Sequence, residues 1–296
     1  MISLVTGGAG FIGSNLVDEL VKLKHKVIVL DNLKTGRISN LEKSKKKIIF
    51  KKLDLYKDKS KINKIFKNYK VDNVFHLAGL ADIVPSIVKP QDYFDTNVVG
   101  TLNILEAAKN FKVKKFIYAA SASCYGIPKK YPTNETSPVT TEYPYATSKY
   151  LGEKLVLDWA KIYKMNNVSF RFFNVYGPRS RTTGAYGAVF GVFLAQKLAN
   201  KPLTIVGNGK QTRDFIHVFD VTSALCKSIK NAKSGEIYNL GSGKQTTVNQ
   251  IANLISNKKL FIPERPGEPK RSQADIKKNE RTVTGKVVSN KMDKTI

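Results

Sequence analysis

The stretch Thr6-Gly7-Gly8-Ala9-Gly10-Phe11-Ile12-Gly13 lies between a short apolar run, residues 2–6, and a stretch with helical periodicity, residues 14–23. Glycines at such a turn let backbone amides approach a pyrophosphate, and the N-terminus of the following helix favours an anion. The last glycine of the turn also lets the helix pack closely on the strand. This context predicts a dinucleotide site that includes Gly7, Gly10, Phe11, Ile12 and Gly13.

Upstream of residue 172, short β-branched runs alternate with amphipathic helical stretches, a pattern typical of a parallel α/β sheet. Right-handed crossovers between such strands give a doubly wound sheet. We therefore expect an α/β protein of the Rossmann type. The predicted strands cover residues 2–6, 26–30, 48–51, 73–76, 115–118 and 168–172.

Downstream of residue 172, glycine and proline interrupt the chain frequently, as at Gly177-Pro178 and at residues 207–209. This texture predicts a smaller, loop-rich substrate-binding domain after an NAD-binding domain of residues 1–172. Residues 213–229 read as a strand and a helix that rejoin the first sheet. The second domain then comprises residues 173–212 and 230–276, and the polar, lysine-rich tail 277–296 is expected to be poorly ordered.

The composition narrows the possible partners. The formal charge of +27 comes from lysines spread along the whole chain without aromatic platforms, which favours a solvated surface over a nucleic-acid site. The apolar run at the N-terminus is too short for a signal peptide or a membrane span. Cys124 and Cys226 are far apart and show no metal-ligand spacing, which favours a cytoplasmic protein without a disulfide framework. The three histidines predict no metal site either.

Acidic residues follow the second and third predicted strands. Asp31 lies about 20 residues beyond the glycine turn, where a carboxylate accepts hydrogen bonds from the adenosine ribose and repels a 2′-phosphate. It therefore favours NAD over NADP, although Lys34 and Arg37 are nearby. Asn32 belongs to the same expected site, and Asp54 with Leu55 is expected to hold the adenine.

Tyr145 and Lys149 are four residues apart, just after a proline suited to start a helix, so both side chains share one helix face. A neighbouring ammonium and the positive nicotinamide would favour the tyrosine phenolate, which could then take a hydroxyl proton while hydride leaves to the cofactor. Ser121, at the end of the fifth strand, could donate a hydrogen bond to the same substrate oxygen. We expect these three residues to be catalytic.

Further motifs are His76-Leu77-Ala78-Gly79, Asn97, Ser121-Ala122-Ser123-Cys124-Tyr125-Gly126 and Phe173-Asn174-Val175-Tyr176-Gly177-Pro178. With the glycine turn, Asp31 and the Tyr145 and Lys149 pair, they resemble the extended short-chain dehydrogenase/reductase family over residues 1–277. Within it, the chain is most similar to UDP-glucose 4-epimerases and the related UDP-N-acetylhexosamine 4-epimerases. Gly79 stands where the family more often has alanine. The resemblance adds Leu77, Ala78 and Asn97 to the expected cofactor site.

The resemblance implies an isomerase that uses NAD transiently. Tyr145 would remove the 4-hydroxyl proton as hydride passes from C4 to NAD, the 4-keto sugar would turn within the site, and hydride would return to its other face. Ser121 would orient the oxygen, and Lys149 would bind the nicotinamide ribose while lowering the pKa of the tyrosine.

Other functions remain open at this point. Related nucleotide-sugar dehydratases carry an Asp-Glu pair directly after the active-site hydroxyl residue, and related decarboxylases a glutamate at the second position, whereas this chain has Ala122 and Ser123. A reductase of the same family is a further alternative. A non-catalytic NAD-binding sensor or scaffold is another, although Ser121, Tyr145 and Lys149 are all present.

The resemblance also implies how a nucleotide-diphosphate sugar is bound. Asn174, Arg213 and Arg265 would hold the diphosphate, since arginine pairs well with phosphate oxygens, and Glu268 would contact the nucleotide ribose. Ser272 stands where some hexose-restricted epimerases carry a bulky tyrosine, so it leaves room for an N-acetyl group.

Two long helical stretches, residues 92–110 and 145–163, resemble those that pair across the family's dimer interface, so a homodimer is expected. The family generally continues with a tryptophan- and proline-containing segment and a final helix. Residues 277–296 show neither, which leaves the lid of the sugar pocket in question.

Overall fold

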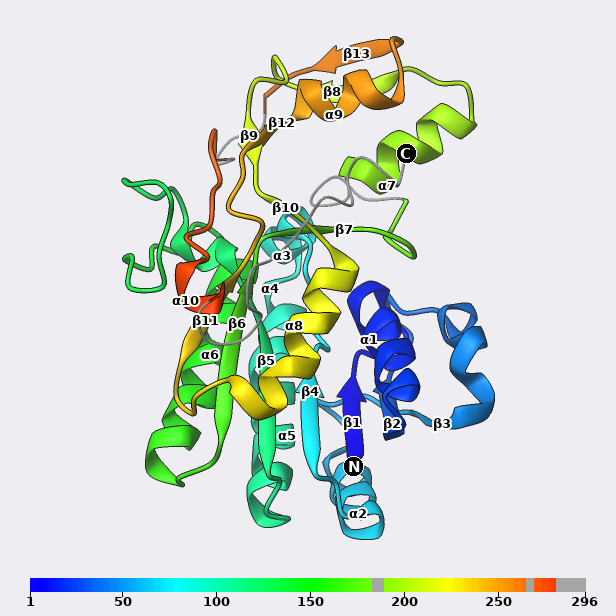
Figure 1. The fold of residues 1–296 in the computed structure, drawn as a ribbon, viewed down its shortest axis with the longest axis vertical. Helices are drawn as coiled ribbons and strands as arrows, with labels where there is room; N and C mark the ends of the chain where they lie inside the picture. The colour runs from blue at the N-terminus through cyan, green and yellow to red at the C-terminus, as the bar shows by residue number, and fades with distance from the viewer. Residues whose placement is uncertain (183–188, 265–268, 281–296) are drawn as a thin grey trace.

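Seven strands form the central sheet of the computed structural model, which describes residues 1–182, 189–264 and 269–280. Their order is β11-β6-β5-β4-β1-β2-β3, and every neighbouring pair is parallel (Figure 1). All six predicted strands are present, so the Rossmann-type sheet is confirmed. The bounds are β1 Ile2–Thr6, β2 Lys26–Asp31, β3 Ile48–Lys52, β4 Asn73–His76, β5 Lys115–Ser121, β6 Asn167–Phe172 and β11 Ile237–Leu240.

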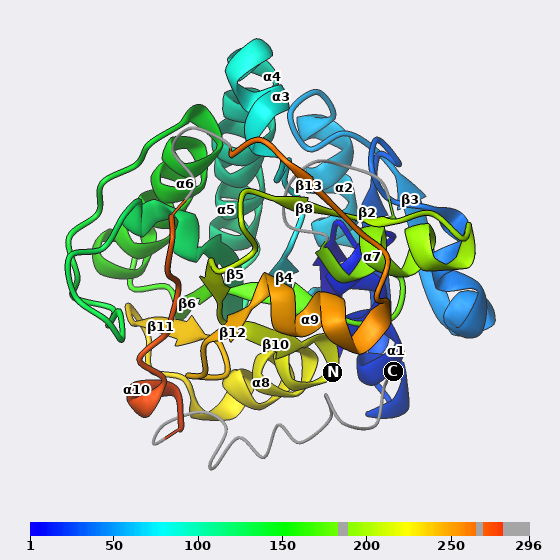
Figure 2. The same ribbon diagram turned by 90° about the horizontal axis from the view of Figure 1, so that it is seen from above.

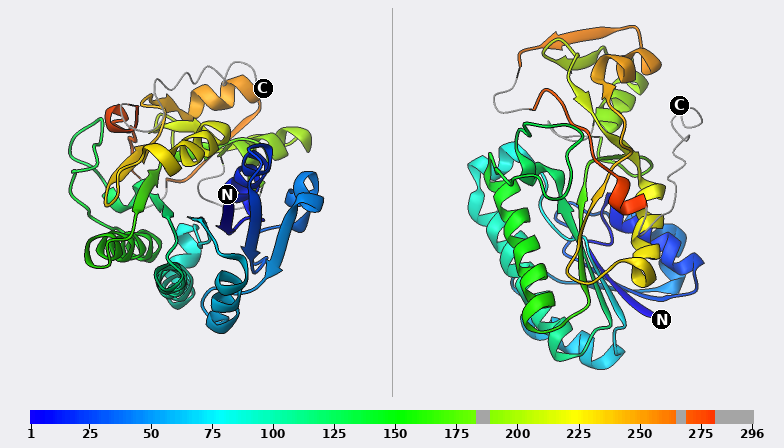
Figure 3. Two further views of the ribbon diagram at one scale, coloured as in Figure 1. Left: turned by 60° about the horizontal axis from the view of Figure 1, so that its bottom comes forward. Right: turned by 60° about the vertical axis from the view of Figure 1, so that its left-hand side comes forward.

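Helices cover both faces of this sheet because its strands are apolar on both sides. Adjacent residues alternate between two cores: Val5 and Ile117 belong to the core under one helical layer, and Leu4 and Phe116 to the core under the other. The helices of the first layer are α1 (Phe11–Lys22) and α8 (Val218–Asn231). Those of the second layer are α2 (Lys59–Tyr69), α5 (Gly100–Asn110) and α6 (Pro144–Ile162), as the end-on and side views show (Figure 3).

Short helical elements fill the connections. The segment expected to be one helix, residues 92–110, consists of α4 (Pro90–Phe94), a π-helical turn η2 (Asp95–Val99) and α5 in direct succession. Before it lies α3 (Ile83–Val88). Two 3-10 helices, η1 (Ile38–Lys47) and η3 (Ala122–Tyr125), follow the carboxyl ends of β2 and β5 respectively.

A smaller upper lobe covers the carboxyl ends of the sheet strands, opposite the N-terminus (Figures 1 and 2). It has its own apolar core, which includes Phe193, Ile205 and Ile251. Its elements are α7 (Val189–Leu198), β8 (Leu203–Val206), α9 (Val248–Ile255) and β13 (Lys259–Ile262), with β8 parallel to β13. The lobes are joined through β7 (Asn174–Tyr176), β9 (Thr212–Arg213), β10 (Phe215–His217) and β12 (Thr246–Thr247).

The segment 213–229 rejoins the first lobe differently from the prediction. Its strand, β10, pairs with β7 and not with the central sheet, and only its helix, α8, packs on the sheet. The seventh place in the sheet belongs to β11, from a segment that the sequence assigned to the second domain. Four residues of β11 pair in register with β6, from Ile237 opposite Ser169 to Leu240 opposite Phe172.

The expected disordered tail begins differently as well. Residues 277–279 form a short helix, α10 (Lys277–Asn279), which packs beside β11 and buries Asn279. The remainder of that segment, residues 281–296, lies outside the described residues. Within the described ranges, none of the helices is long and apolar enough to cross a membrane.

Candidate active site

A cavity of about 490 Å³ lies between the carboxyl ends of the strands and the upper lobe. Ligands bind at this position in open α/β sheets, beyond the carboxyl ends of the strands and at the point where the strand order reverses. In this sheet that point lies between the neighbouring strands β4 and β1. Seventeen of the expected site residues line it: Gly7, Gly10, Phe11, Ile12, Gly13, Asp31, Asn32, Asp54, Leu55, Leu77, Ala78, Ser121, Tyr145, Lys149, Asn174, Arg213 and Ser272.

The glycine turn has no room for side chains. A Cβ atom on Gly7, whose φ is +67°, would lie 2.7 Å from the backbone of Ala78, and one on Gly13 would lie 2.2 Å from the Gly7 carbonyl oxygen. Because β1, the turn and the N-terminus of α1 pack backbone to backbone, the amides at the start of α1 border the cavity without side chains covering them. This arrangement fits a pyrophosphate.

Asp31 is buried at the end of β2, where it holds the loops on either side. One carboxylate oxygen accepts the backbone N–H of Ala9 at 2.9 Å and the other that of Leu33 at 2.8 Å. Burial raises the pKa of Asp31, and these two hydrogen bonds oppose the rise. A carboxylate has about four acceptor positions, so those left over can receive ribose hydroxyls.

The next pair of polar residues at this end of the cavity is also connected. Asn32 donates a hydrogen bond from Nδ2 to Asp54 at 2.8 Å. Asp54 in turn accepts the backbone N–H of Tyr56 at 2.9 Å, which orients the loop after β3. Asp31 and Asp54 therefore border one continuous end of the cavity, as expected for an adenosine site.

Asn97 is the expected cofactor residue that does not line the cavity. Its amide is fully buried and accepts the N–H of Leu80 at 2.9 Å, while donating to the Leu80 carbonyl at 3.0 Å and to Ser148 Oγ at 2.9 Å. It therefore supports the loop after β4 from behind. The sequence predicted Asn97 as a cofactor-binding residue, and the structure places its side chain behind the loop that borders the cavity.

His76 continues this support across the sheet. Its Nδ1 lies 2.7 Å from Thr6 Oγ1 and its Nε2 lies 2.8 Å from Thr101 Oγ1. The Thr101 hydroxyl donates to the Asn97 carbonyl, so it must accept from Nε2–H, while the Thr6 hydroxyl accepts from Ala78 N–H and donates to Nδ1. Burial lowers the pKa of this neutral His76 to about 3.

The three expected catalytic residues come together at the carboxyl end of β5. Ser121 ends that strand, and Tyr145 and Lys149 lie one turn apart on α6, which starts with Pro144 at its first position. Lys149 is buried, with Nζ 4.4 Å from the centre of the Tyr118 ring. Burial lowers the pKa of Lys149 to about 7, and the charge of Glu153 opposes this.

Burial also raises the pKa of Tyr145, while hydrogen bonds with the hydroxyls of Ser121 and Ser123 lower it. The negative charge of Asp82 raises it further. Burial is the largest of these influences on the pKa of Tyr145.

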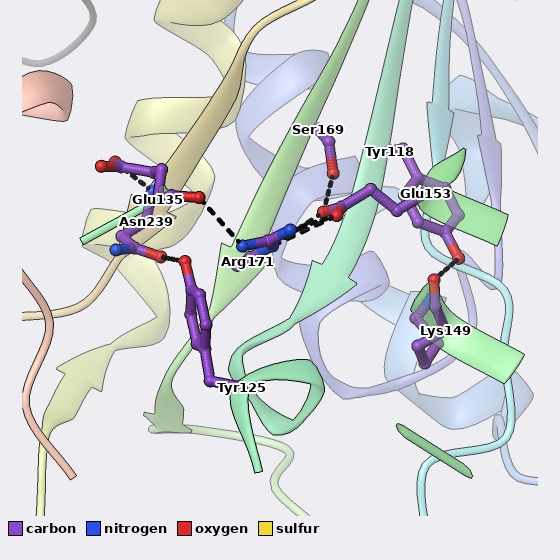
Figure 4. A network of polar contacts seen from close by, with 8 residues as sticks. All are labelled: Tyr118, Tyr125, Glu135, Lys149, Glu153, Ser169, Arg171 and Asn239. Atoms are coloured by element: carbon purple, nitrogen blue, oxygen red, sulfur yellow. Dashed lines mark hydrogen bonds and ion pairs between the residues drawn. The ribbon is translucent and has the colours of Figure 1, made fainter. Parts of the chain in front are cut away.

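One turn beyond Lys149, Glu153 forms a buried network that the sequence analysis missed (Figure 4). Arg171 on β6 donates to it from Nη2 at 2.6 Å and from Nε at 3.1 Å, and Ser169 donates to it at 2.9 Å. The Arg171 guanidinium also lies 4.6 Å from the centre of the Tyr125 ring. An arginine inside a strand of otherwise uncharged residues was the available signal, since a buried charge needs a partner.

The upper lobe brings further polar residues to the cavity. Arg213 donates to the carbonyls of Thr212 at 2.9 Å and Pro269 at 2.8 Å, which ties it to the segment carrying Ser272. Arg271, which the sequence analysis missed, also lines the cavity and lies 5.4 Å from the centre of the Tyr131 ring. Arg265 and Glu268, both expected to bind substrate, lie outside the described residues.

A second missed pair connects loops on opposite sides of the cavity. Arg181, in the loop after β7, donates through both terminal nitrogens to Asp82, in the loop after β4, at 2.9 and 2.8 Å. Both residues line the cavity. No surface pattern distinguishes Arg181 from the many other basic residues of the sequence.

The description "NAD dependent epimerase/dehydratase family" belongs to the family model that matches residues 3–241 of this chain. The chain belongs to this family. A UDP-glucose 4-epimerase of Mycolicibacterium smegmatis is 35% identical over 284 residues, which cover 93% of this chain and 90% of that protein.

Solved structures of other members are similar as well. A UDP-N-acetylglucosamine 4-epimerase from Methanobrevibacter ruminantium, solved with UDP-N-acetylmuramic acid, is 33% identical with a TM-score of 0.92, covering 99% of this chain and 94% of that chain. A UDP-glucose 4-epimerase from Thermus thermophilus, solved with NAD, is 32% identical with a TM-score of 0.88, covering 95% and 92%. The predicted family, fold class and NAD cofactor of this epimerase/dehydratase family member are thereby confirmed.

The donor set fits the cofactor of this family. The glycine turn leaves the α1 amides uncovered, Asp31 retains acceptor positions for ribose hydroxyls, and Lys149 lies beside Tyr145 at the opposite end. Among the described residues, no group of three histidine, cysteine, aspartate or glutamate side chains is arranged to hold a metal ion.

Proposed function

We propose that this chain interconverts the C4 epimers of a UDP-hexose or a UDP-N-acetylhexosamine through a 4-keto intermediate. The observation that carries the proposal is the convergence of Ser121, Tyr145 and Lys149 in the same cavity as the glycine turn. NAD, when bound, supplies the chemistry of accepting a hydride and returning it. Because the hydride and the proton both return to the sugar, no net oxidation results.

The roles of the residues follow from their positions. Tyr145 takes the proton of the 4-hydroxyl and gives it back, as a general base and then a general acid. Ser121 donates a hydrogen bond to the sugar oxygen throughout. Lys149, one turn further along α6 and buried beside the Tyr118 ring, holds the nicotinamide ribose.

The site favours epimerisation over dehydration. Eliminating water across C5 and C6 needs an additional acid and base, which dehydratases carry directly after the active-site hydroxyl residue. Here those positions hold Ala122 and Ser123, at the start of η3 and bordering the cavity. A dehydratase or reductase is the alternative enzyme, and it predicts a stable keto product or net consumption of NADH.

Substrate binding is proposed for the face of the cavity formed by the upper lobe. Arg213, together with Arg265, is proposed to hold the diphosphate, with Asn174 beside them and Glu268 at the nucleotide ribose. Ser272 lines the cavity and is small enough to leave room for an N-acetyl group. A Ser272→Tyr variant should lose activity on UDP-N-acetylglucosamine far more than on UDP-glucose. An equal loss on both sugars would contradict this assignment.

We propose that NAD is held by residues 1–172 together with α8, and the substrate largely by the upper lobe. A cytoplasmic homodimer is proposed through the helical stretches 92–110 and 145–163. Exposed apolar side chains on and beside these helices support it: Leu151 lies on α6, and Ile87 and Val88 lie on α3, which packs against α6. Sedimentation analysis would distinguish a dimer from a monomer.

The direct test is to incubate the purified protein with UDP-glucose and, separately, with UDP-N-acetylglucosamine, and to follow the C4 epimers by NMR. Epimer formation without net NADH, abolished in a Tyr145→Phe variant that still binds NAD, is the expected result. A keto sugar as the final product would establish the dehydratase. NAD binding with no turnover of any nucleotide sugar would favour a non-catalytic sensor or scaffold.

A further inference from the structure

Ser121 and Ser123 share two hydrogen bonds at the start of η3. The backbone N–H of Ser123 donates to Ser121 Oγ at 3.2 Å, and the Ser123 hydroxyl donates to the same atom at 2.8 Å. Both residues line the cavity. The 3-10 turn creates this geometry, because Ser121 is its N-cap and the residue two positions later folds back over it.

A serine hydroxyl has one hydrogen to donate and two lone pairs that accept. In this chain both lone pairs of Ser121 Oγ are occupied by Ser123, one by its amide and one by its hydroxyl. The hydrogen of Ser121 is then the only part of the hydroxyl left to interact with anything else. Ser121 can therefore donate to a ligand oxygen but cannot accept from it.

Resting on the proposed function, we propose that Ser123 is a positioning residue that makes Ser121 a permanent hydrogen-bond donor to the reacting sugar oxygen. The chemistry requires such a donor. A 4-keto oxygen has no hydrogen and can only accept, while the 4-hydroxyl of either epimer gives its hydrogen to Tyr145 and accepts from Ser121. A donor that does not rotate can form the hydrogen bond with both the 4-hydroxyl and the 4-keto oxygen. The serine therefore does not have to reorient in either half of the reaction.

Ser123 also faces Tyr145. Hydrogen bonding by this pair of hydroxyls lowers the pKa of the phenol, against burial and the charge of Asp82. Because each hydroxyl has one hydrogen, a Ser123 hydroxyl that donates to Ser121 Oγ acts on the phenol through Ser121, whose own hydrogen lies between the phenol oxygen and the sugar oxygen. Replacing Ser123 by alanine removes one hydroxyl but leaves the backbone N–H on Ser121 in place. Ser121 then regains one lone pair and can turn its hydrogen away from the sugar.

The first test compares Ser123→Ala with Ser123→Thr, which retains the hydroxyl. We expect Ser123→Ala to lower kcat about 10-fold, the effect of one weakened hydrogen bond in a closed site, with KM unchanged within about 2-fold. The acid limb of its kcat profile should move to higher pH. Ser123→Thr should keep kcat within about 3-fold of the parent enzyme.

Ser137→Ala is the matched control, because its hydroxyl bonds to Asn134 on an exposed loop at 3.0 Å. It should change neither kcat nor the pH profile. NAD content and circular dichroism show whether each variant folds. The proposal is overturned if Ser123→Ala keeps the parent kcat and acid limb, or if folded Ser123→Thr is as impaired as Ser123→Ala.

A second measurement separates this proposal from the proposed function. Ultraviolet difference titration of the NAD-bound protein against its Tyr145→Phe variant reports ionisation of Tyr145 without any turnover. Ser123→Ala should titrate at higher pH than the parent, and an unchanged titration would contradict the role of Ser123. Failure of the parent enzyme on every UDP-sugar would instead refute the proposed function, while this titration would still report on Ser123.

Discussion

Glu153 and Arg171 form an ion pair that is shielded from solvent, with Nη2 2.6 Å from Oε1 and side chains that are 1% and 3% exposed. The pair joins α6 to β6. Since Tyr145 and Lys149 precede Glu153 on the same face of α6, the ion pair fixes the rotation of the helix that carries them. Removing one partner of this ion pair should destabilise the protein strongly, because it leaves the other charge buried without a partner.

Glu153→Gln should lower the free energy of unfolding by about 3 to 5 kcal/mol, because Arg171 stays charged inside the protein. Chemical denaturation measures the change. Asp158→Asn is the control on the same helix, since Asp158 pairs with Lys154 at 3.5 Å in an exposed position and should cost less than about 1 kcal/mol. Similar losses for both variants would show that Arg171 finds another partner.

His76 should make the protein less stable in acid. Its pKa is lowered to about 3 in the folded protein from 6.5, so between these values the unfolded chain binds a proton that the folded chain does not. Stability from this group is complete above pH 6.5 and is lost as the pH falls, by about 2 kcal/mol between pH 7 and pH 5. The stability difference between the parent and His76→Asn should shrink by that amount in urea denaturation at the two pH values. A constant difference would mean that His76 accepts a proton in the folded state.

Asp31→Asn should weaken NAD binding roughly 10- to 100-fold. The carboxylate has two acceptor oxygens for two backbone N–H groups and the ribose hydroxyls, whereas the amide of asparagine has only one. Removing the negative charge should also narrow the preference for NAD over NADP. Isothermal titration calorimetry of the cofactor-free protein gives both dissociation constants. Unchanged affinity for NAD would remove Asp31 from the cofactor site.

Substitutions at Arg181 and at Asp82 should shift the pH profile of kcat in opposite directions. The Asp82 charge raises the pKa of Tyr145, and the Arg181 guanidinium bound to it compensates that charge. In kcat measured against pH, Asp82→Asn should therefore move the acid limb to lower pH and Arg181→Gln to higher pH. Shifts in the same direction would mean that the pair acts through the shape of the cavity mouth and not through charge.

The sequence predicted the core of the fold because its strands follow a local rule. Each of the first six strands is a short β-branched or aromatic run bounded by turn residues, and all six were found within three residues at each end. The seventh, β11, consists of Ile237, Tyr238, Asn239 and Leu240, and nothing local distinguishes it from a strand of the second lobe. Its place is decided by pairing with β6, more than 60 residues earlier in the chain.

The site residues show the same difference between local motifs, which the sequence predicts, and contacts between distant segments, which it does not. The glycine turn, Asp31, Ser121, Tyr145 and Lys149 occur in motifs whose spacing is local, and the structure places all of them on one cavity. Contacts between distant segments were missed, such as Arg171 with Glu153 and Arg181 with Asp82. The position of Asn97 behind the cavity was not predicted for the same reason, because it depends on the loop at Leu80 with which Asn97 forms hydrogen bonds.

The return of the chain to the sheet at β11 also sets an order of assembly. During synthesis, β6 is complete at residue 172, but its outer edge stays unpaired until residue 240 has emerged, after α7 and β8 of the upper lobe. Asn239 in β11 then accepts a hydrogen bond from the Tyr125 hydroxyl at 2.8 Å. The ring of Tyr125 packs against the Arg171 guanidinium. A nascent chain thus carries an open strand edge while α7 and β8 are synthesised, and a fragment ending before residue 237 would keep that edge available for pairing with another chain.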